Sequence, residues 1–250
     1  MSSLFSVFEG ETLKKDIKKL IIPTKPAADD PILGPTPEIV YQWNTFAKKH
    51  GALVEKVMTK VIQHAPGWEA ASQTRFKCDT SETKNLIDRI AICRKHDIAV
   101  FIECKRNLGN VSGPYLGKIK TYNSWVYENS DAIANELRFR TNDPLIAFCV
   151  FNAYGDVSAR EIVKGIPVIR PSDLSSIFGT FVFKAFNEFN GFVYSTLLEH
   201  DALRDMLSKN DPQLATLDTS VRNHKNADVL AHDFREVIKT KLRSLTYVDQ

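Results

Sequence analysis

The chain has 250 residues, of which 43% are hydrophobic and 25% are charged, as in ordinary soluble globular proteins. This length allows one domain with appendages or two small ones, and a core that needs neither disulfides nor structural metal. The formal net charge of +3 permits a nucleic-acid partner without requiring one. No apolar run approaches the roughly 20 residues of a membrane span, and the N-terminus lacks a basic stretch followed by an apolar one. We therefore expect a cytoplasmic protein with no membrane partner.

The four cysteines are Cys78, Cys93, Cys104 and Cys149. They form no CxxC pair and no histidine stands at zinc-finger spacing, so a zinc site is not expected. Most of them fall in apolar, strand-like runs, where a free cysteine behaves as a small hydrophobic residue. The pattern predicts buried, reduced thiols rather than a disulfide framework.

Residues 1–37 are predicted to form an N-terminal arm with a short basic helix, followed by a linker that contains five prolines between 23 and 37. A long helix is predicted over residues 37–63, with Pro66 and Gly67 as stop signals. Glu55 falls at the edge of its apolar stripe, where a carboxylate can reach toward the sheet. The stripe consists of Leu53, Val54, Val57, Met58, Val61 and Ile62.

The next segments alternate between strand-like and helix-like patterns. Strands are predicted at 73–78, 85–93, 98–105, 145–151 and 161–169. Helices are predicted at 115–128, after a glycine-rich loop, and at 173–177, where Ser172 is the expected N-cap. From residue 179 onward the chain reads as helical. This order of elements predicts an α/β fold in which helices flank a mixed central sheet.

Two acidic residues are predicted to face each other across a hairpin. If the strands on either side of Lys95 and His96 pair symmetrically, Asp88 lies directly opposite Glu103 on one face of the sheet. Lys105 lies two residues beyond Glu103 and therefore on the same face.

Two carboxylates placed this way repel each other, and an otherwise apolar sheet would not hold them together without a compensating cation. A hard divalent ion such as Mg²⁺ suits carboxylate oxygens. From its position Lys105 can orient or deprotonate a water molecule, or neutralise a phosphate oxygen. This combination is suited to phosphodiester hydrolysis. A competing interpretation places Glu103 and Lys105 on the solvent face of an edge strand.

The stretches HGALVEKVMTKVIQHAPGW, LIDRIAI and FIECKR resemble the PD-(D/E)xK, or restriction-endonuclease-like, nuclease superfamily. The resemblance covers residues 38–178 and implies a restriction-endonuclease-like core there. Residues 179–250 would then be an extra helical C-terminal region. Phenylalanines of this region, between 178 and 192, are predicted to pack into a core or a dimer contact.

The resemblance also implies site residues. In this family an aspartate before the strand and the acid of the E-x-K triplet bind metal, and the lysine assists catalysis. A glutamate on the preceding helix often joins them. The matching positions here are Asp88, Glu103, Lys105 and Glu55. One departure is visible, because Ile87 stands where the family's name has proline.

We therefore expect a Mg²⁺-dependent deoxyribonuclease that acts as an endonuclease, with Mn²⁺ able to substitute, although the sequence alone does not separate endonuclease from exonuclease action. DNA is preferred over RNA because most members of the family act on DNA. Two alternatives stay open: a catalytically inactive nucleic-acid- or protein-binding module, and an RNA-cleaving endonuclease. A homodimer is a further hypothesis, because cutting both strands requires two active sites.

Four residues are candidates for contacting nucleic acid. Arg106 and Asn107 begin the glycine-rich loop that follows the E-x-K strand, and such a loop can approach a phosphate backbone. Lys118 and Lys120 lie on the next predicted helix, where the family often places polar groups that contact substrate. The competing interpretation is a turn-forming loop and a solvated helix face.

Overall fold

The computed structural model describes Lys15 and residues 38–72, 78–80, 83–85, 87–154, 159–178 and 234–246. The predicted linker and the phenylalanine run beyond Phe178 lie outside these residues, as does most of the region after 178. No described helix combines the length and the apolar character needed to cross a membrane.

Five of the described strands form one mixed sheet, as predicted. Their order in the sheet is β1-β4-β5-β6-β7. β1, β4 and β5 pair antiparallel, whereas β5, β6 and β7 pair parallel. The strands are β1 (Glu69–Ser72), β4 (Arg89–Cys93), β5 (Ile98–Lys105), β6 (Leu145–Asn152) and β7 (Val168–Ile169). A separate two-stranded ladder joins β2 (Cys78–Thr80) to β3 (Thr83–Asn85).

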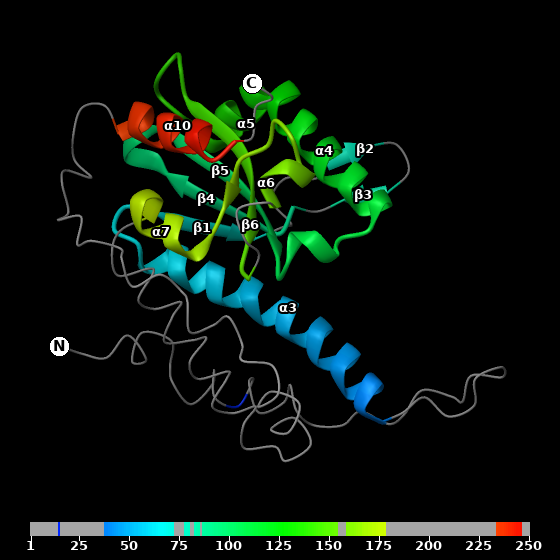
Figure 1. Ribbon diagram of the computed structural model, residues 1–250. Coiled ribbons are helices and arrows are strands. Elements are labelled where there is room, and N and C mark those ends of the chain that lie inside the picture. The colour runs from blue at the N-terminus through cyan, green and yellow to red at the C-terminus, as the bar shows by residue number, and fades with distance from the viewer. Residues whose placement is uncertain are drawn as a thin grey trace.

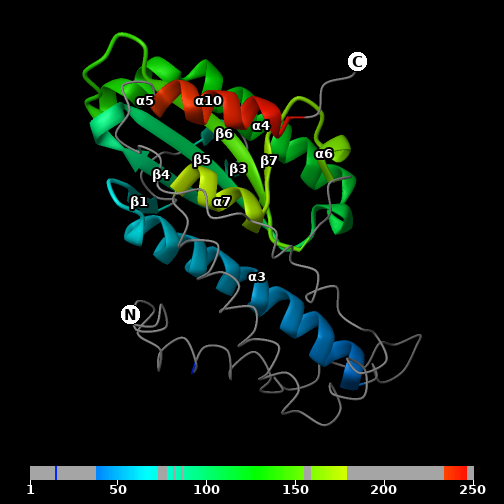
Figure 2. The ribbon, with the colours of Figure 1, turned by 60° about the vertical axis from the view of Figure 1, so that its left-hand side comes forward.

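Helices cover both faces of this sheet. Figure 1 shows α3 along one side of the strands and α4 and α5 on the other side, and in Figure 2 α7 and α10 lie next to each other against the sheet. The helices are α3 (Glu38–His64), α4 (Gly113–Glu128), α5 (Ser130–Leu137), α6 (Ala159–Ile162), α7 (Pro171–Phe178) and α10 (Phe234–Ser244). The short 3₁₀ turns are η1 (Arg94–His96) and η2 (Leu108–Asn110).

The two faces of β5 belong to two separate apolar clusters, because successive side chains of a strand point to opposite sides. One side of β5 packs with the buried stripe of α3, which confirms that predicted stripe. The residues on that side are Ile98, Val100, Ile102 and Cys104. The other side packs with α4 and α5 through Ala99 and Phe101. The predicted alternation along this strand is therefore confirmed.

The C-terminal helix α10 joins the α3 side of the core. Ile238, Leu242 and Leu245 are buried in the same cluster as α3, and Phe178 of α7 packs edge-on against Trp68 with ring centres 4.9 Å apart. This part of the 179–250 region therefore contributes directly to the core.

The strand expected at 73–78 lies outside the described residues, apart from Cys78, which begins β2. The sheet strand β1 at Glu69–Ser72 was not predicted, and its pairing with β4 outweighs its weak strand propensity. Two local predictions are wrong. The strand expected at 161–169 is reduced to β7, because α6 and a turn containing Gly165, at a φ of 79°, occupy most of it.

The second error concerns the cap of α7. This helix begins at Pro171, which suits a first helical position, so Ser172 is already inside it. The Asp173 carboxylate instead accepts a hydrogen bond from the Arg170 backbone N–H at 3.0 Å. The cysteine prediction holds where the structure tests it: Cys93, Cys104 and Cys149 are buried and free.

Candidate functional site

The β4–β5 hairpin has the predicted register. Arg89 pairs with Ile102 and Cys93 pairs with Ile98, around η1. Asp97 closes this turn at a φ of 51°, in the left-handed region that aspartate tolerates better than most residues. Continuing the register by one residue beyond Arg89 places Asp88 opposite Glu103.

Both acids are buried beside one ammonium group. Glu103 is 1% exposed and Asp88 is 9% exposed. Lys105 Nζ lies 2.7 Å from Glu103 Oε1 and 3.9 Å from Asp88 Oδ2. The Cys104 backbone N–H also donates to Asp88 Oδ2 at 2.8 Å. The structure therefore brings Asp88, Glu103 and Lys105 together, with two carboxylates for a single lysine.

Tyr115 completes this cluster and was missed from the sequence. Its hydroxyl donates to Glu103 Oε1 at 2.6 Å and accepts from Lys105 Nζ at 3.0 Å. The same ammonium lies 4.4 Å from the centre of the Tyr115 ring, a cation–π contact. Tyr115 stands in the first turn of α4, the helix that follows β5. The only signal available in the sequence was this position, directly after the loop that leaves the E-x-K strand.

The protonation of these groups follows from burial and charge. Burial raises the pKa of Asp88 to about 7, and the neighbouring Glu103 carboxylate adds to the rise. Burial lowers the pKa of Lys105, but the charges of Glu103 and Asp88 outweigh this effect and hold it above its usual value. Burial and the Glu103 charge also raise the pKa of Tyr115. At neutral pH Lys105 and Tyr115 therefore keep their protons and act as donors.

Glu55 has a different partner. Its carboxylate forms an ion pair with Arg89 at 3.5 Å, and burial raises its pKa. Arg89 also donates to the Glu55 backbone oxygen at 3.1 Å and to the Asp88 backbone oxygen. The structure thus places Glu55 within electrostatic range of Asp88, Glu103 and Lys105 without direct contact. Arg89 was not predicted, although strand alternation places it on the α3 face, next to Asp88 in the chain.

Two carboxylates of the site fit a metal ion better than the predicted three. Among the described residues no group of three or more His, Cys, Asp or Glu side chains is arranged to hold a metal. Glu103 Oε2, however, is buried and has no hydrogen-bond partner in the described part of the chain. A magnesium site usually needs only one or two carboxylates, because water and substrate phosphates supply the other ligands. Asp88 and Glu103 meet this requirement.

The four candidate nucleic-acid contacts fall into different environments. Arg106 is half-buried, and burial lowers its pKa. The Asn107 side chain accepts from the Gly109 N–H at 2.9 Å and so caps η2. Lys118 and Lys120 are exposed on α4, and Lys118 Nζ lies 5.8 Å from the centre of the Tyr115 ring. Lys118 is thus within cation–π range of Tyr115, a residue of the acid–lysine cluster.

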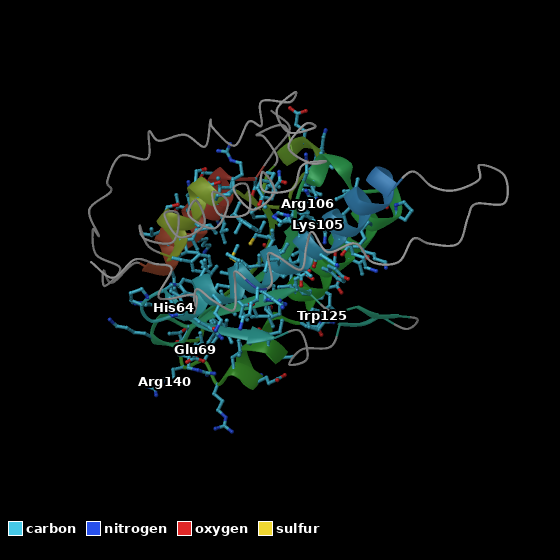
Figure 3. All side chains as sticks on the ribbon, turned by 90° about the horizontal axis from the view of Figure 1, so that it is seen from below. His64, Glu69, Lys105, Arg106, Trp125 and Arg140 are labelled. Carbon is cyan, nitrogen blue, oxygen red and sulfur yellow. The ribbon has the colours of Figure 1, made fainter. Side chains whose placement is uncertain are left out.

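The loop after β5 is anchored from the neighbouring strand. Asn152 pairs with Lys105 in the β5–β6 register, and its buried side-chain oxygen accepts from the Leu108 N–H at 3.0 Å. In Figure 3 Lys105 and Arg106 lie together, far from Glu69 and Arg140. The cluster and the anchored loop therefore occupy one end of the sheet.

No protein-family model matches the chain, and no match is found among curated proteins or solved structures. What the site can do is therefore inferred from its own residues and their geometry.

Proposed function

We propose that the chain is a metal-dependent nuclease that hydrolyses DNA phosphodiester bonds, with a restriction-endonuclease-like core over residues 38–178. The observation that carries the proposal is the buried pair of Asp88 and Glu103, which shares the single ammonium of Lys105. The order of elements around this pair adds support: α3, the β1–β4–β5 meander, α4 and then the parallel strand β6.

The charge balance of the pair favours a cation. A buried carboxylate without compensation is costly, and the second acid of this pair raises the cost. Lys105 compensates one charge, and its closer contact is with Glu103. The rise in the pKa of Asp88 is the expected response of a carboxylate in this position when no metal is present. A divalent cation would balance the negative charge of the pair, so the pKa of Asp88 would not need to rise.

The residues then take separate roles. Asp88 and Glu103 hold Mg²⁺, for which Mn²⁺ can substitute, and the unpaired Glu103 Oε2 is the natural ligand atom. When bound, the ion polarises the scissile phosphate and makes a neighbouring water more acidic. Lys105 stays protonated, so it neutralises a phosphate oxygen or orients the water rather than acting as a base. Tyr115 holds the Lys105 ammonium in place.

Glu55, through Arg89, sets the position of Asp88 and stays close enough to influence the bound ion electrostatically. The preference for DNA rests on the family resemblance, and the proposal of a homodimer rests on the two active sites that cutting both strands requires. Lys118, exposed beside Tyr115, is a group that can contact a backbone phosphate next to the cluster.

A second candidate function is a nucleic-acid- or protein-binding module without catalysis. The observation in its favour is that no three-ligand metal group occurs among the described residues. The intact set of Asp88, Glu103 and Lys105 argues against it, because binding alone would not require buried acids beside a lysine.

A plasmid-nicking assay with purified full-length protein tests the proposal. Mg²⁺, Mn²⁺ and EDTA are compared for the wild type, Glu103→Gln and Lys105→Ala. Glu69→Gln and Lys60→Ala are the matched controls, because both side chains are exposed and Glu69 lies at the other end of the sheet. We expect metal-dependent nicking that both site variants abolish and both controls retain.

Other results would redirect the proposal. Nicking that survives both site variants would mean a contaminating nuclease or a different site. Parallel digestion of single-stranded RNA separates an RNA-cleaving enzyme from a DNA-cleaving one. If neither nucleic acid is cut while DNA still binds in EDTA, the binding module becomes the better account. A monomeric mass by light scattering at working concentration would remove the homodimer.

A further inference from the structure

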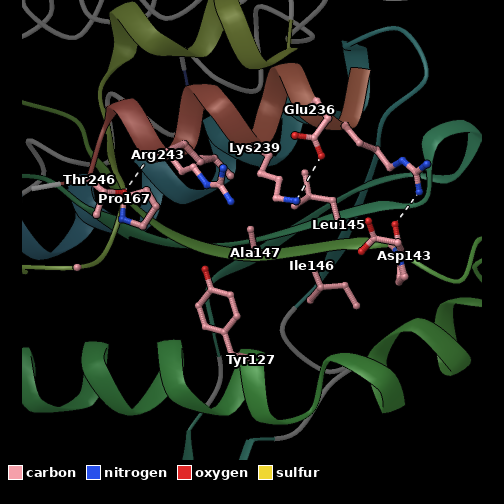
Figure 4. A pocket seen from close by; sticks show the side chains of 14 residues that line it. Tyr127, Asp143, Leu145, Ile146, Ala147, Pro167, Glu236, Lys239, Arg243 and Thr246 are labelled. Atoms are coloured by element: carbon pink, nitrogen blue, oxygen red, sulfur yellow. Dashed lines mark hydrogen bonds and ion pairs between the residues drawn. The ribbon is translucent and has the colours of Figure 1, made fainter. Parts of the chain in front are cut away.

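A cavity of about 640 Å³ opens at the free edge of β6, between α10 and the last turn of α4 (Figure 4). It is lined by the start of β6, from Leu145 to Ala147. In the β5–β6 register Leu145 lies beside Ile98, whereas Lys105 lies beside Asn152 at the other end of both strands. At roughly 3.3 Å per residue the cavity is about 20 Å from the acid–lysine cluster. It is therefore a separate place on the molecule.

Basic side chains line this cavity along one face of α10. Arg235, Lys239 and Arg243 recur every four residues, a spacing that stacks side chains along one side of a helix. Arg235 is already engaged, because it donates to the Thr141 hydroxyl at 2.9 Å and to the Asp143 backbone oxygen at 2.6 Å.

The other two cations of this face are available to a ligand. Lys239 has only an exposed contact with Glu236 at 3.3 Å, and such surface ion pairs are weak. The Arg243 side chain forms no hydrogen bond or ion pair with any described residue, and only its backbone oxygen accepts, from the Thr246 N–H at 3.1 Å. Figure 4 shows Lys239 and Arg243 extending from α10 into the space above Tyr127. Two cationic groups one helical turn apart thus face the cavity, as a phosphate site requires.

The opposite wall offers an aromatic ring. Tyr127 projects from α4 toward α10 and is 52% exposed, an unusual exposure for a large side chain that packs beside a sheet. Among the described residues only Val237 is a comparably exposed large hydrophobic side chain. An exposed ring at the wall of a cavity suits stacking on a planar group.

The floor offers unpaired backbone groups. The Leu145 N–H donates to the Asp97 oxygen on the β5 side, so the N–H and C=O of the next residue, Ile146, point to the cavity side. On that side of β6 the neighbouring strand is β7, which pairs with β6 only at Val150 and Phe151. No described strand takes the Ile146 groups, and backbone donors and acceptors next to a core need partners.

We propose that this cavity binds a nucleoside phosphate. The phosphate lies between Lys239 and Arg243, the base stacks on Tyr127, and the edge of the base pairs with the Ile146 backbone. The volume lies within the range of about 300–1,000 Å³ that is typical of small-molecule sites. A peptide strand fits less well, because β7 and Pro167 close the edge soon after Ile146. The proposal does not depend on nuclease activity.

Calorimetric titration of the full-length chain with AMP, ATP and inorganic phosphate, all in EDTA, tests this site. The variants are Arg243→Ala, Lys239→Ala and Tyr127→Leu, each checked for folding by circular dichroism. Lys60→Ala controls for loss of a surface charge, and Glu103→Gln reports on binding at the distant acid–lysine cluster. We expect saturable nucleotide binding that Arg243→Ala weakens by about tenfold or more. Tyr127→Leu should weaken AMP binding without changing phosphate binding, and both controls should match the wild type.

Three outcomes would overturn the proposal. One is the absence of nucleotide binding at millimolar concentration. Another is nucleotide binding that Arg243→Ala and Tyr127→Leu leave unchanged, or that Glu103→Gln removes. A third is equal affinity for phosphate and AMP, because the ring and the backbone edge would then contribute nothing. None of these results affects the proposed nuclease function, because the nicking assay requires metal and tests the acid–lysine cluster at the other end of the sheet.

Discussion

Two places in this fold hold acidic and basic side chains below the surface, and they balance charge in opposite ways. At the end of β5, Asp88 and Glu103 share the one ammonium of Lys105. At the junction of α7 and α10, the single carboxylate of Asp173 lies 3.2 Å from Lys241 Nζ and 3.7 Å from Arg170 Nε. The first cluster has an excess of negative charge, and the second has more than enough positive charge.

The difference separates a site from a structural contact. The Asp173 carboxylate is fully paired. It accepts a hydrogen bond from the Arg170 N–H at the start of α7, and its ion pair with Lys241 links α7 to α10. The β5 cluster keeps one buried carboxylate oxygen of Glu103 without a partner. Buried acids are common at structural junctions when they are compensated. The proposed role for a cation rests on the first arrangement, in which two buried carboxylates share one lysine.

The largest expected effect separates the two clusters by activity. Glu103→Gln should lower DNA nicking by about a hundredfold or more, the range typical for loss of a group that stabilises developing charge. Asp173→Asn should leave nicking per folded molecule within about twofold, because the surface charge near the proposed site is unchanged. Nicking rates at saturating Mg²⁺ measure both. An equal loss of nicking in Glu103→Gln and Asp173→Asn would mean that the β5 cluster and the α7–α10 junction do not differ in function.

The next effect is stabilisation by metal. A ligand that binds only the folded state at a hundred times its dissociation constant adds about 2.7 kcal/mol of stability. Mn²⁺ should therefore raise the melting temperature of the wild type and of Asp173→Asn, and should not raise that of Glu103→Gln. Thermal melts in EDTA and in Mn²⁺ provide the measurement. A similar rise in Glu103→Gln would show that the metal binds elsewhere.

Without metal, the two aspartates should respond to substitution with opposite signs. Asp173→Asn should destabilise the protein by about 1–3 kcal/mol, because Lys241 loses its charged partner. Asp88→Asn should stabilise it at neutral pH, because the amide removes the repulsion from Glu103 and its oxygen can still accept from the Cys104 N–H. Urea unfolding in EDTA measures both free energies of unfolding.

The stabilising effect of Asp88→Asn should depend on pH. The folded protein keeps the Asp88 proton up to about pH 7, whereas the unfolded chain releases it near pH 3.8. Between these values the folded state binds more protons, so the stability of the wild type falls as pH rises. The advantage of the variant should therefore be small near pH 4 and largest above pH 7. A constant or inverted difference would contradict the raised pKa.

The smallest effect concerns Tyr115, which has no counterpart at the α7–α10 junction. Tyr115→Phe keeps the ring under Lys105 but removes the hydroxyl that joins it to Glu103. We expect nicking to fall about tenfold, or 1.4 kcal/mol, with Mn²⁺ stabilisation retained. Tyr127→Phe is the matched control, since this exposed tyrosine lies on the same helix. An unchanged rate for Tyr115→Phe would mean that the hydroxyl is not needed to position Lys105.

The local parts of this molecule could be predicted from the sequence. The α3 stripe and the register that sets Asp88 opposite Glu103 depend on contacts between residues that are close in the chain. For such contacts the periods of helix and strand, with a short turn, are sufficient. The burial of Glu103 and the pairing of β5 with both β4 and β6 exclude the solvent-exposed edge strand that was the competing interpretation.

Where the residues of a segment have weak or mixed propensities, the tertiary structure decided its secondary structure. The EAAS segment of β1 is a strand because β4 offers it a partner, and the 161–169 segment forms a helix and a turn before β7 joins β6. The tertiary structure likewise decided the ion pair of Glu55 with Arg89 and the hydrogen bond between Tyr115 and Lys105.

By itself the sequence determined the buried stripe of α3, the alternation along β5 and the placement of two acids and a lysine on one face of the β4–β5 hairpin. These features depend on the spacing of residues along single elements and across one short turn. Only the tertiary structure decided that Lys105 is held by Tyr115, that Glu55 faces Arg89, and that α10 and α4 enclose a cavity at the edge of β6. The Glu55–Arg89 pair and the cavity join segments far apart in the chain, and the contact of Tyr115 with Lys105 joins a helix to a strand. They follow from how whole helices dock on the sheet, and the docking is determined by the shape and burial of both surfaces together.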